Sequence, residues 1–147
     1  MAPLNIKVIT TYNNKLYKEY AYRFKETYNW SFPLKIYNED ECMMKVLPEL
    51  KEFVERNKHR QPYSDYKVKG KEFLTDGVRF SYKVYAYTHA LMNEDVDGLI
   101  CIDADSVFHK KIDEEWIKKH IHRDECMMTY LGRGNNYSEC GFLYFNI

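Results

Sequence analysis

The sequence has 147 residues, of which 45% are hydrophobic and 30% are charged, as in ordinary globular domains. This length predicts a single domain spanning residues 1–147, large enough to bury a hydrophobic core. The 22 basic residues balance the 22 acidic ones, which argues against nonspecific binding to nucleic acid or to an anionic membrane surface.

The first part of the chain alternates between strand-like and helix-like patterns. Residues 4–11 are rich in β-branched residues and predict a strand, and residues 15–28 follow with aromatic residues at helical spacing. A short strand is expected over 34–37, followed by an acidic turn over 38–41. Another helix is expected to begin near Pro48, because proline is favoured in the first turn of a helix.

The second part continues the same alternation. The polar, tyrosine-rich residues 57–70 lack periodicity and predict a surface loop. The elements expected after it are a helix over 77–92, a strand over 98–102, a helix over 112–121 and strands over 126–131 and 142–145. Strands that alternate with helices predict an α/β sandwich with a mostly parallel central sheet.

Two carboxylates, Asp103 and Asp105, directly follow the apolar strand Gly98–Ile102. On an extended backbone, residues two apart point to the same side, so the two side chains are expected to project together from a buried strand. Burying like charges so close together is costly unless a cation neutralises them. Oxygen ligands favour Mg²⁺ or Mn²⁺, and a bound diphosphate would complete the metal shell. Turn or helix-capping aspartates are the alternative interpretation.

Two further segments are expected near this pair. Thr10, Thr11 and Tyr12 follow the first strand, and ligands of parallel sheets bind outside the carboxyl ends of the strands. Arg79 and Lys83 are four residues apart and therefore lie on one face of the helix before the aspartates. That face is either a cationic contact for a diphosphate or simply the solvated side of an amphipathic helix.

The strand ending in Ile102-Asp103-Ala104-Asp105 resembles the D-x-D motif of nucleotide-sugar glycosyltransferases with the GT-A fold. The resemblance covers most of the 147 residues, including the N-terminal strand, the basic helix before the motif and the E-x-G-F pattern that begins at Glu139. It implies a Rossmann-like, GT-A sandwich with a mostly parallel central sheet.

The resemblance also implies a function. The protein would be a metal-dependent glycosyltransferase that transfers a sugar from a nucleoside-diphosphate sugar to a hydroxyl acceptor on a glycan, a lipid or a protein. Asp105 would bind Mn²⁺ or Mg²⁺ directly, and Asp103 would contact the metal or the ribose. Glu139 is the candidate catalytic residue, as general base or as a ligand of acceptor hydroxyls, or else an ordinary loop glutamate.

The remaining candidate residues would bind the nucleotide. Arg79 and Lys83 would reach the diphosphate or the nucleotide, as the matching helix does in similar glycosyltransferases. Thr10, Thr11 and Tyr12 would contact the nucleobase and ribose through hydroxyls, backbone and a stacked ring. Without the resemblance, Tyr12 is merely an aromatic residue at a strand end.

Two other functions remain open. A sugar-phosphate nucleotidyltransferase has a similar scaffold, but it typically carries a glycine-rich loop after the first strand, and residues 10–15 contain no glycine. The second is a noncatalytic remnant that binds nucleotide sugars. The sequence stops at Ile147 directly after an apolar strand, so we expect the domain to lack its C-terminal portion. Similar enzymes often take a histidine metal ligand from that portion.

Localisation is indicated by the cysteines and by the N-terminus. None of the four cysteines form a C-x-x-C pair, and Cys101 and Cys140 lie within apolar segments, as reduced core cysteines do, so a cytoplasmic protein is expected. The first residues lack a basic segment followed by a long apolar run, so they do not read as a secretory signal. No apolar run approaches the length of a membrane span, and no membrane span is expected.

Overall fold

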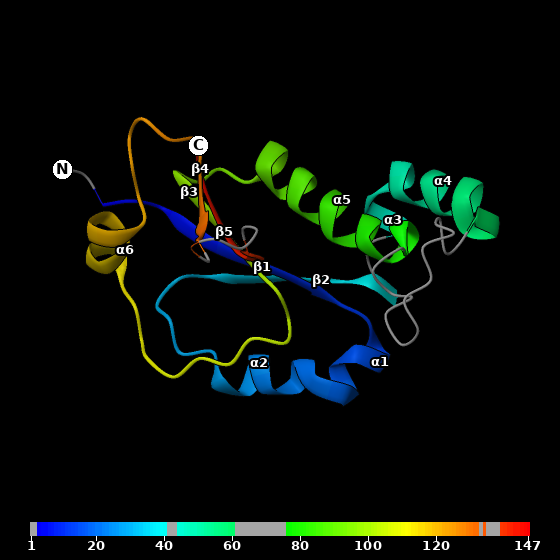
Figure 1. Ribbon diagram of the computed structural model, residues 1–147, viewed down its shortest axis with the longest axis horizontal. Helices are drawn as coiled ribbons and strands as arrows, with labels where there is room; N and C mark the ends of the chain where they lie inside the picture. The colour runs from blue at the N-terminus through cyan, green and yellow to red at the C-terminus, as the bar shows by residue number, and fades with distance from the viewer. Residues whose placement is uncertain (1–2, 41–43, 61–75, 133, 135–138) are drawn as a thin grey trace.

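The computed structural model describes residues 3–40, 44–60, 76–132, 134 and 139–147. Its strands are β1 (Ile6–Tyr12), β2 (Leu34–Asn38), β3 (Gly98–Ile102), β4 (Met128–Leu131) and β5 (Glu139–Asn146). They form one five-stranded sheet in the order β2-β1-β3-β5-β4 (Figure 1). β1 pairs in parallel with β2 and β3, whereas β5 is antiparallel to both β3 and β4. The predicted α/β class is confirmed, and the sheet is mixed, with its parallel part formed by β2, β1 and β3.

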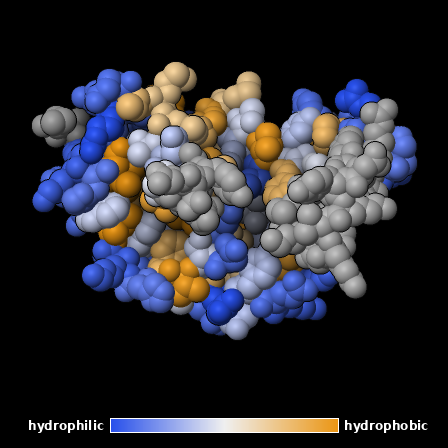
Figure 2. All heavy atoms as spheres, viewed as in Figure 1, coloured by the Kyte–Doolittle hydropathy of each residue, from blue (hydrophilic) through white to orange (hydrophobic). Residues whose placement is uncertain are grey.

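Helices cover both faces of this sheet. They are α1 (Asn14–Leu16), a π-helix η1 (Tyr17–Ala21), α2 (Tyr22–Thr27), α3 (Met44–Val46), α4 (Pro48–Asn57), a 3₁₀-helix η3 (Lys58–Arg60), α5 (Gly77–Asn93) and α6 (Glu114–His120). Helices α4 and α5 pack on one face, and α2 and α6 pack on the other (Figure 1). Hydrophilic residues gather at the two ends of the molecule, where α6 and α4 lie (Figure 2).

The alternation of side chains along β1 divides the core into two parts. Ile9 packs with the residues of α4 and α5, whereas Ile6 and Val8 pack with Phe24 of α2 and Ile117 of α6. Successive residues of a strand point to opposite faces of the sheet, so the apolar residues of β1 contribute to the core on both faces. All five residues of the central strand β3 are buried, as its uninterrupted apolar run predicts.

Several element boundaries differ from the sequence-based expectation. The helix expected over 15–28 is divided by the π-helix η1, and its start at Asn14 is fixed by the Asn13 side chain, which accepts a hydrogen bond from the Leu16 N–H at 2.8 Å. The helix expected over 112–121 begins two residues later, because Asp113 caps it through the Trp116 N–H at 2.9 Å. Most of the loop expected over 57–70 lies outside the described residues.

Both strands expected near the C-terminus are present with different limits. The strand expected over 126–131 begins at Met128, and the one expected over 142–145 extends over Glu139–Asn146 because β5 pairs on both sides. Cys101 is buried in β3, but Cys140 is exposed, and neither forms a disulfide. None of the described helices is long and apolar enough to cross a membrane.

Gly98 begins β3 directly against the buried ring of Tyr144 and offers a test of this packing. A Cβ added at Gly98 would lie 2.5 Å from the Tyr144 hydroxyl oxygen and 2.8 Å from its ring. Gly98→Ala should therefore lower the free energy of unfolding by about 1–3 kcal/mol, more than the ~0.4–1 kcal/mol gained from a stiffer unfolded chain. Urea denaturation measures the effect. Gly132→Ala is the control, because a Cβ there meets nothing within 4 Å; equal stability of the two variants would contradict the prediction.

Candidate functional site

The strand order creates a topological switch point between β1 and β3. From β1 the chain crosses over α1 and α2 to β2 on one side, and from β2 it crosses over α4 and α5 to β3 on the other side. The carboxyl ends of β1 and β3 therefore meet at a topological switch point, where open α/β sheets bind ligands. A cavity of about 640 Å³ lies there, which we call the switch-point cavity. It is lined by Thr11, Leu16, Glu19, Tyr20, Glu39, Arg79, Phe80, Lys83, Asp103, Ala104 and Asp105.

The two aspartates of the D-x-D motif lie on a β-turn, not on extended backbone. The Asp103 carbonyl accepts a hydrogen bond from the Ser106 N–H at 3.1 Å, which closes the turn. The Asp103 N–H donates to the Gly141 carbonyl of β5 at 2.9 Å. The predicted burial of the pair is wrong, because Asp103 is half-buried and Asp105 is exposed. Both carboxylates still line the switch-point cavity, because the turn directs them there.

Lys83 of α5 joins this turn to β5. Its ammonium group forms an ion pair with the Asp103 carboxylate and donates a hydrogen bond to the Cys140 carbonyl at 2.9 Å. The Lys83 and Asp103 side chains are 24% and 38% exposed, so the pair is only partly shielded from solvent. Lys83 therefore balances the charge of Asp103, which leaves Asp105 as the more accessible carboxylate of the motif.

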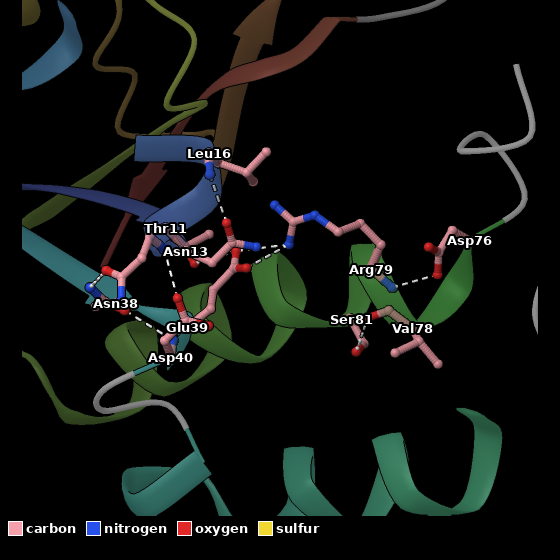
Figure 3. Close-up of polar contacts among 11 residues, drawn as sticks. Thr11, Asn13, Leu16, Asn38, Glu39, Asp40, Asp76, Val78, Arg79 and Ser81 are labelled. Carbon is pink, nitrogen blue, oxygen red and sulfur yellow. Dashed lines mark hydrogen bonds and ion pairs between the residues drawn. The ribbon is translucent and has the colours of Figure 1, made fainter. Parts of the chain in front are cut away.

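Arg79, one turn earlier on α5, binds a buried carboxylate on the opposite wall (Figure 3). Its Nη1 donates to Oε1 and Oε2 of Glu39, both at 2.8 Å, and the Thr11 hydroxyl donates to Oε1 of Glu39 at 3.1 Å. The Glu39 side chain is only 3% exposed. The N-terminus of α5 is held by Asp76, whose carboxylate accepts from the Arg79 N–H at 2.8 Å. The cavity thus has an internal network that links the ends of β1 and β2 to α5.

Sequence reasoning missed Glu39 and Tyr20 as site residues. Glu39 belongs to the segment predicted as an acidic turn. Its position directly after β2, at the sheet edge where β1 also ends, is the feature that could have identified it. Tyr20 stood among the apolar positions of a predicted helix, but it belongs to the π-helix η1 and lines the switch-point cavity. Burial raises the pKa of the Tyr20 phenol, against the lowering effect of Arg79, and the Asp105 and Glu39 carboxylates raise it further.

Thr10, Thr11 and Tyr12 do not act as one group. All three belong to β1, including Tyr12, which was expected just beyond the strand, so their side chains alternate between the two faces of the sheet. Thr11 points toward α5 and lines the cavity. Thr10 is fully buried, and Tyr12 packs against Tyr17 with ring centroids 5.5 Å apart. Neither Thr10 nor Tyr12 is among the residues lining the switch-point cavity.

Glu139, the candidate catalytic residue, begins β5, where its backbone is in register with Leu131 of β4. Its side chain lies outside what the structure describes. The E-x-G-F pattern that contains it does lie next to the D-x-D turn, since Gly141 binds the Asp103 backbone and Cys140 binds Lys83.

The two carboxylates of the turn are of the chemical type that binds a metal together with a phosphate group. The described residues contain no cluster of three or more histidine, cysteine, aspartate or glutamate side chains that could hold a metal ion. Mg²⁺ usually takes only one or two carboxylates and completes its shell with waters and substrate phosphates. Asp103 and Asp105 provide such a pair, so the residues fit Mg²⁺ or Mn²⁺ bound together with a diphosphate.

A second cavity, of about 580 Å³, lies against the same turn. We call it the Trp30 cavity; it is lined by Trp30, Ile102, Asp103, Asp105, Ser106, Val107, Phe108, His109, Lys110, Leu131, Gly141 and Phe142. Asp103 and Asp105 line both cavities. The D-x-D turn is therefore a shared wall between two cavities that differ in their lining residues.

No family model, curated protein or solved structure matches the chain. The chemistry of the site is therefore inferred from its geometry.

Proposed function

We propose that the protein is a metal-dependent glycosyltransferase of the GT-A fold, which transfers a sugar from a nucleoside-diphosphate sugar to a hydroxyl acceptor. The observation that carries this proposal is the position of the Asp103–Ser106 turn. It lies at the topological switch point, with the cationic side chains of Arg79 and Lys83 in the same cavity. A diphosphate needs cations for its own charge and carboxylates for its metal, and this cavity offers both.

Several residues that line the cavity have specific roles in this proposal. Asp105 and Asp103 would hold Mg²⁺ or Mn²⁺, which when bound stabilises the negative charge that develops on the departing diphosphate. Lys83 exchanges its Asp103 partner for a phosphate oxygen when the donor binds. Arg79 stays oriented by Glu39, which also accepts the Thr11 hydroxyl, and Thr11 would contact the nucleoside.

The nucleotidyltransferase alternative is less compatible with the segment after β1. Such enzymes hold phosphates on a glycine-rich loop with free backbone N–H groups at a helix start. Here β1 ends at Tyr12, and the Asn13 side chain already accepts from the Leu16 N–H at the start of α1. This cap occupies a donor that a phosphate would need.

Turnover assays distinguish the three functions. The purified protein is incubated with UDP- and GDP-sugars and Mn²⁺, with and without EDTA, and release of nucleoside diphosphate is measured. A glycosyltransferase releases it only with metal, through slow donor hydrolysis or faster transfer to an added acceptor. A noncatalytic remnant binds the donor without turnover. A nucleotidyltransferase instead releases pyrophosphate from a nucleoside triphosphate and a sugar phosphate, and that result would overturn the proposal.

Lys83→Met should change the affinity for the metal and the affinity for the diphosphate in opposite directions. Removing the ammonium leaves Asp103 without its ion-pair partner, so Mn²⁺ alone should bind about two- to fivefold more tightly. Binding of UDP or GDP in the presence of Mn²⁺ should weaken, because a phosphate contact is lost. Electron paramagnetic resonance of free Mn²⁺ and calorimetry measure the two effects. Lys118→Met on α6, which breaks a similar pair with Glu114, is the control and should change neither. Weaker binding of Mn²⁺ alone would contradict the prediction.

A further inference from the structure

We propose that the Trp30 cavity binds a carbohydrate, so that the acceptor of the transfer is a glycan and not a lipid or a protein side chain. The assignment of this sugar as acceptor rests on the proposed function, whereas sugar binding to the cavity does not. The cavity combines aromatic walls with carboxylates and a hydroxyl, and this is the composition that a sugar ring requires.

The aromatic wall is held in place by a hydrogen bond and by ring contacts. The Trp30 indole N–H donates to the Lys110 carbonyl at 3.0 Å, which ties the segment before β2 to the segment after the D-x-D turn. The Trp30 ring meets Phe108 at a centroid distance of 4.8 Å and an angle of 86°, and it meets Phe32 at 6.4 Å and 86°. Trp30 is half-buried and lines the cavity. A sugar ring presents an apolar face of C–H groups, whose partial positive charge is attracted to the face of an aromatic ring.

Two carboxylates of the Trp30 cavity are shared with the switch-point cavity. Asp103 and Asp105 line both cavities, Ser106 follows them on the same turn, and carboxylates and hydroxyls are good partners for sugar hydroxyl groups. Because both carboxylates also line the switch-point cavity, a hydroxyl bound beside them faces the proposed donor. The volume of about 580 Å³ is that of a site for a small ligand.

The charged residues of the cavity disfavour a lipid. Asp105 and Lys110 are exposed to water and Asp103 is half-buried, and an aliphatic chain in the cavity would displace that water without replacing its hydrogen bonds, which is costly. A sugar satisfies the same groups by hydrogen bonds while its C–H face covers Trp30.

The test uses the two tryptophans of the chain, Trp30 and Trp116. In Trp116→Phe, all tryptophan fluorescence comes from Trp30. This variant is titrated with maltotriose, cellotriose, lactose and chitotriose, and in parallel with a short isoprenoid phosphate and a serine-rich peptide. We expect a saturable change in Trp30 fluorescence with at least one oligosaccharide and with neither other ligand. Saturation by the isoprenoid or the peptide alone, or by none of the ligands, would overturn the proposal.

Calorimetry of Trp30→Leu with the oligosaccharide that binds is the second measurement. The affinity of Trp30→Leu for this oligosaccharide should fall about tenfold, whereas Trp116→Leu should keep the wild-type affinity. Binding of UDP or GDP with Mn²⁺ to Trp30→Leu should be unchanged, which shows that the variant is folded. Unchanged sugar affinity in Trp30→Leu would overturn the site. If the wild type binds the sugar but no nucleoside diphosphate, the sugar site stands and the proposed function fails.

Discussion

Asp105→Asn should abolish metal-dependent binding of a nucleoside diphosphate. The side chain keeps its size but loses its charge, and it is the carboxylate of the D-x-D turn that is not paired with Lys83. Changes to residues that only support metal ligands cost 10–100-fold in affinity, so removal of a direct ligand should cost about 100-fold or more. Calorimetric titration with UDP and with GDP, in Mn²⁺ and in EDTA, measures the effect.

The control for this variant is Asp95→Asn. Asp95 is exposed in the connection between α5 and β3 and lines neither cavity. Asp95→Asn removes one negative charge, as Asp105→Asn does. The comparison therefore distinguishes loss of a metal ligand from a change in net charge. Wild-type binding by Asp105→Asn in Mn²⁺ would exclude the turn as the metal site. Loss of binding in both variants would point instead to general electrostatic attraction.

Arg79→Met should destabilise the fold, besides weakening nucleotide binding. The change leaves the Glu39 carboxylate, 3% exposed, with the Thr11 hydroxyl but without its cation. Removing one partner of a fully buried pair costs about 3–5 kcal/mol. Arg79 is itself 37% exposed, and water will partly replace it, so we expect a loss of about 2–3 kcal/mol in the free energy of unfolding. Urea denaturation gives this value.

A second substitution tests whether the uncompensated charge is the cause. Glu39→Gln in the Arg79→Met background removes the buried charge, and it should restore more than half of the lost stability. Arg56→Met, on the exposed side of α4, breaks an ion pair with Glu52 and should change the free energy of unfolding by less than about 0.5 kcal/mol. If Arg79→Met were no less stable than Arg56→Met, the Glu39–Arg79 pair would not matter for stability.

The strands and helices around the site were predictable where a clear hydrophobic pattern is bounded by residues that end or cap the element. The bounds of β3 follow from an unbroken apolar run, and α5 follows from aromatic and aliphatic residues at helical spacing after Asp76. The direction of β5 was not predictable, since hydropathy marks a strand but not whether it runs parallel to its neighbour. The division into α1, η1 and α2 was also not predictable, because the π-helix η1 spans only five residues, about one turn, which is too short to leave its own repeat in the apolar pattern.

Within the site, the errors have specific causes. β1 extends one residue further than predicted and includes Tyr12. Because side chains alternate along a strand, Thr11 lines the switch-point cavity, whereas Thr10 and Tyr12 point to the other face of the sheet. The location of Asp103 and Asp105 was predicted, but for an incorrect reason, because a turn and not extended backbone brings them to the cavity. Glu39 escaped notice because its partner, Arg79, is 40 residues away in the sequence.

The burial of β3 has a consequence for how the D-x-D turn responds to ligands. This strand is hydrogen-bonded to β1 and β5 and buried at every residue, so its amides should exchange with solvent deuterium only when the whole sheet opens. We therefore expect the turn to be anchored to one of the slowest-exchanging parts of the molecule. If the turn holds the proposed metal and diphosphate, little backbone entropy would be lost in β3 on binding, and such preorganisation favours tight binding from only a few contacts.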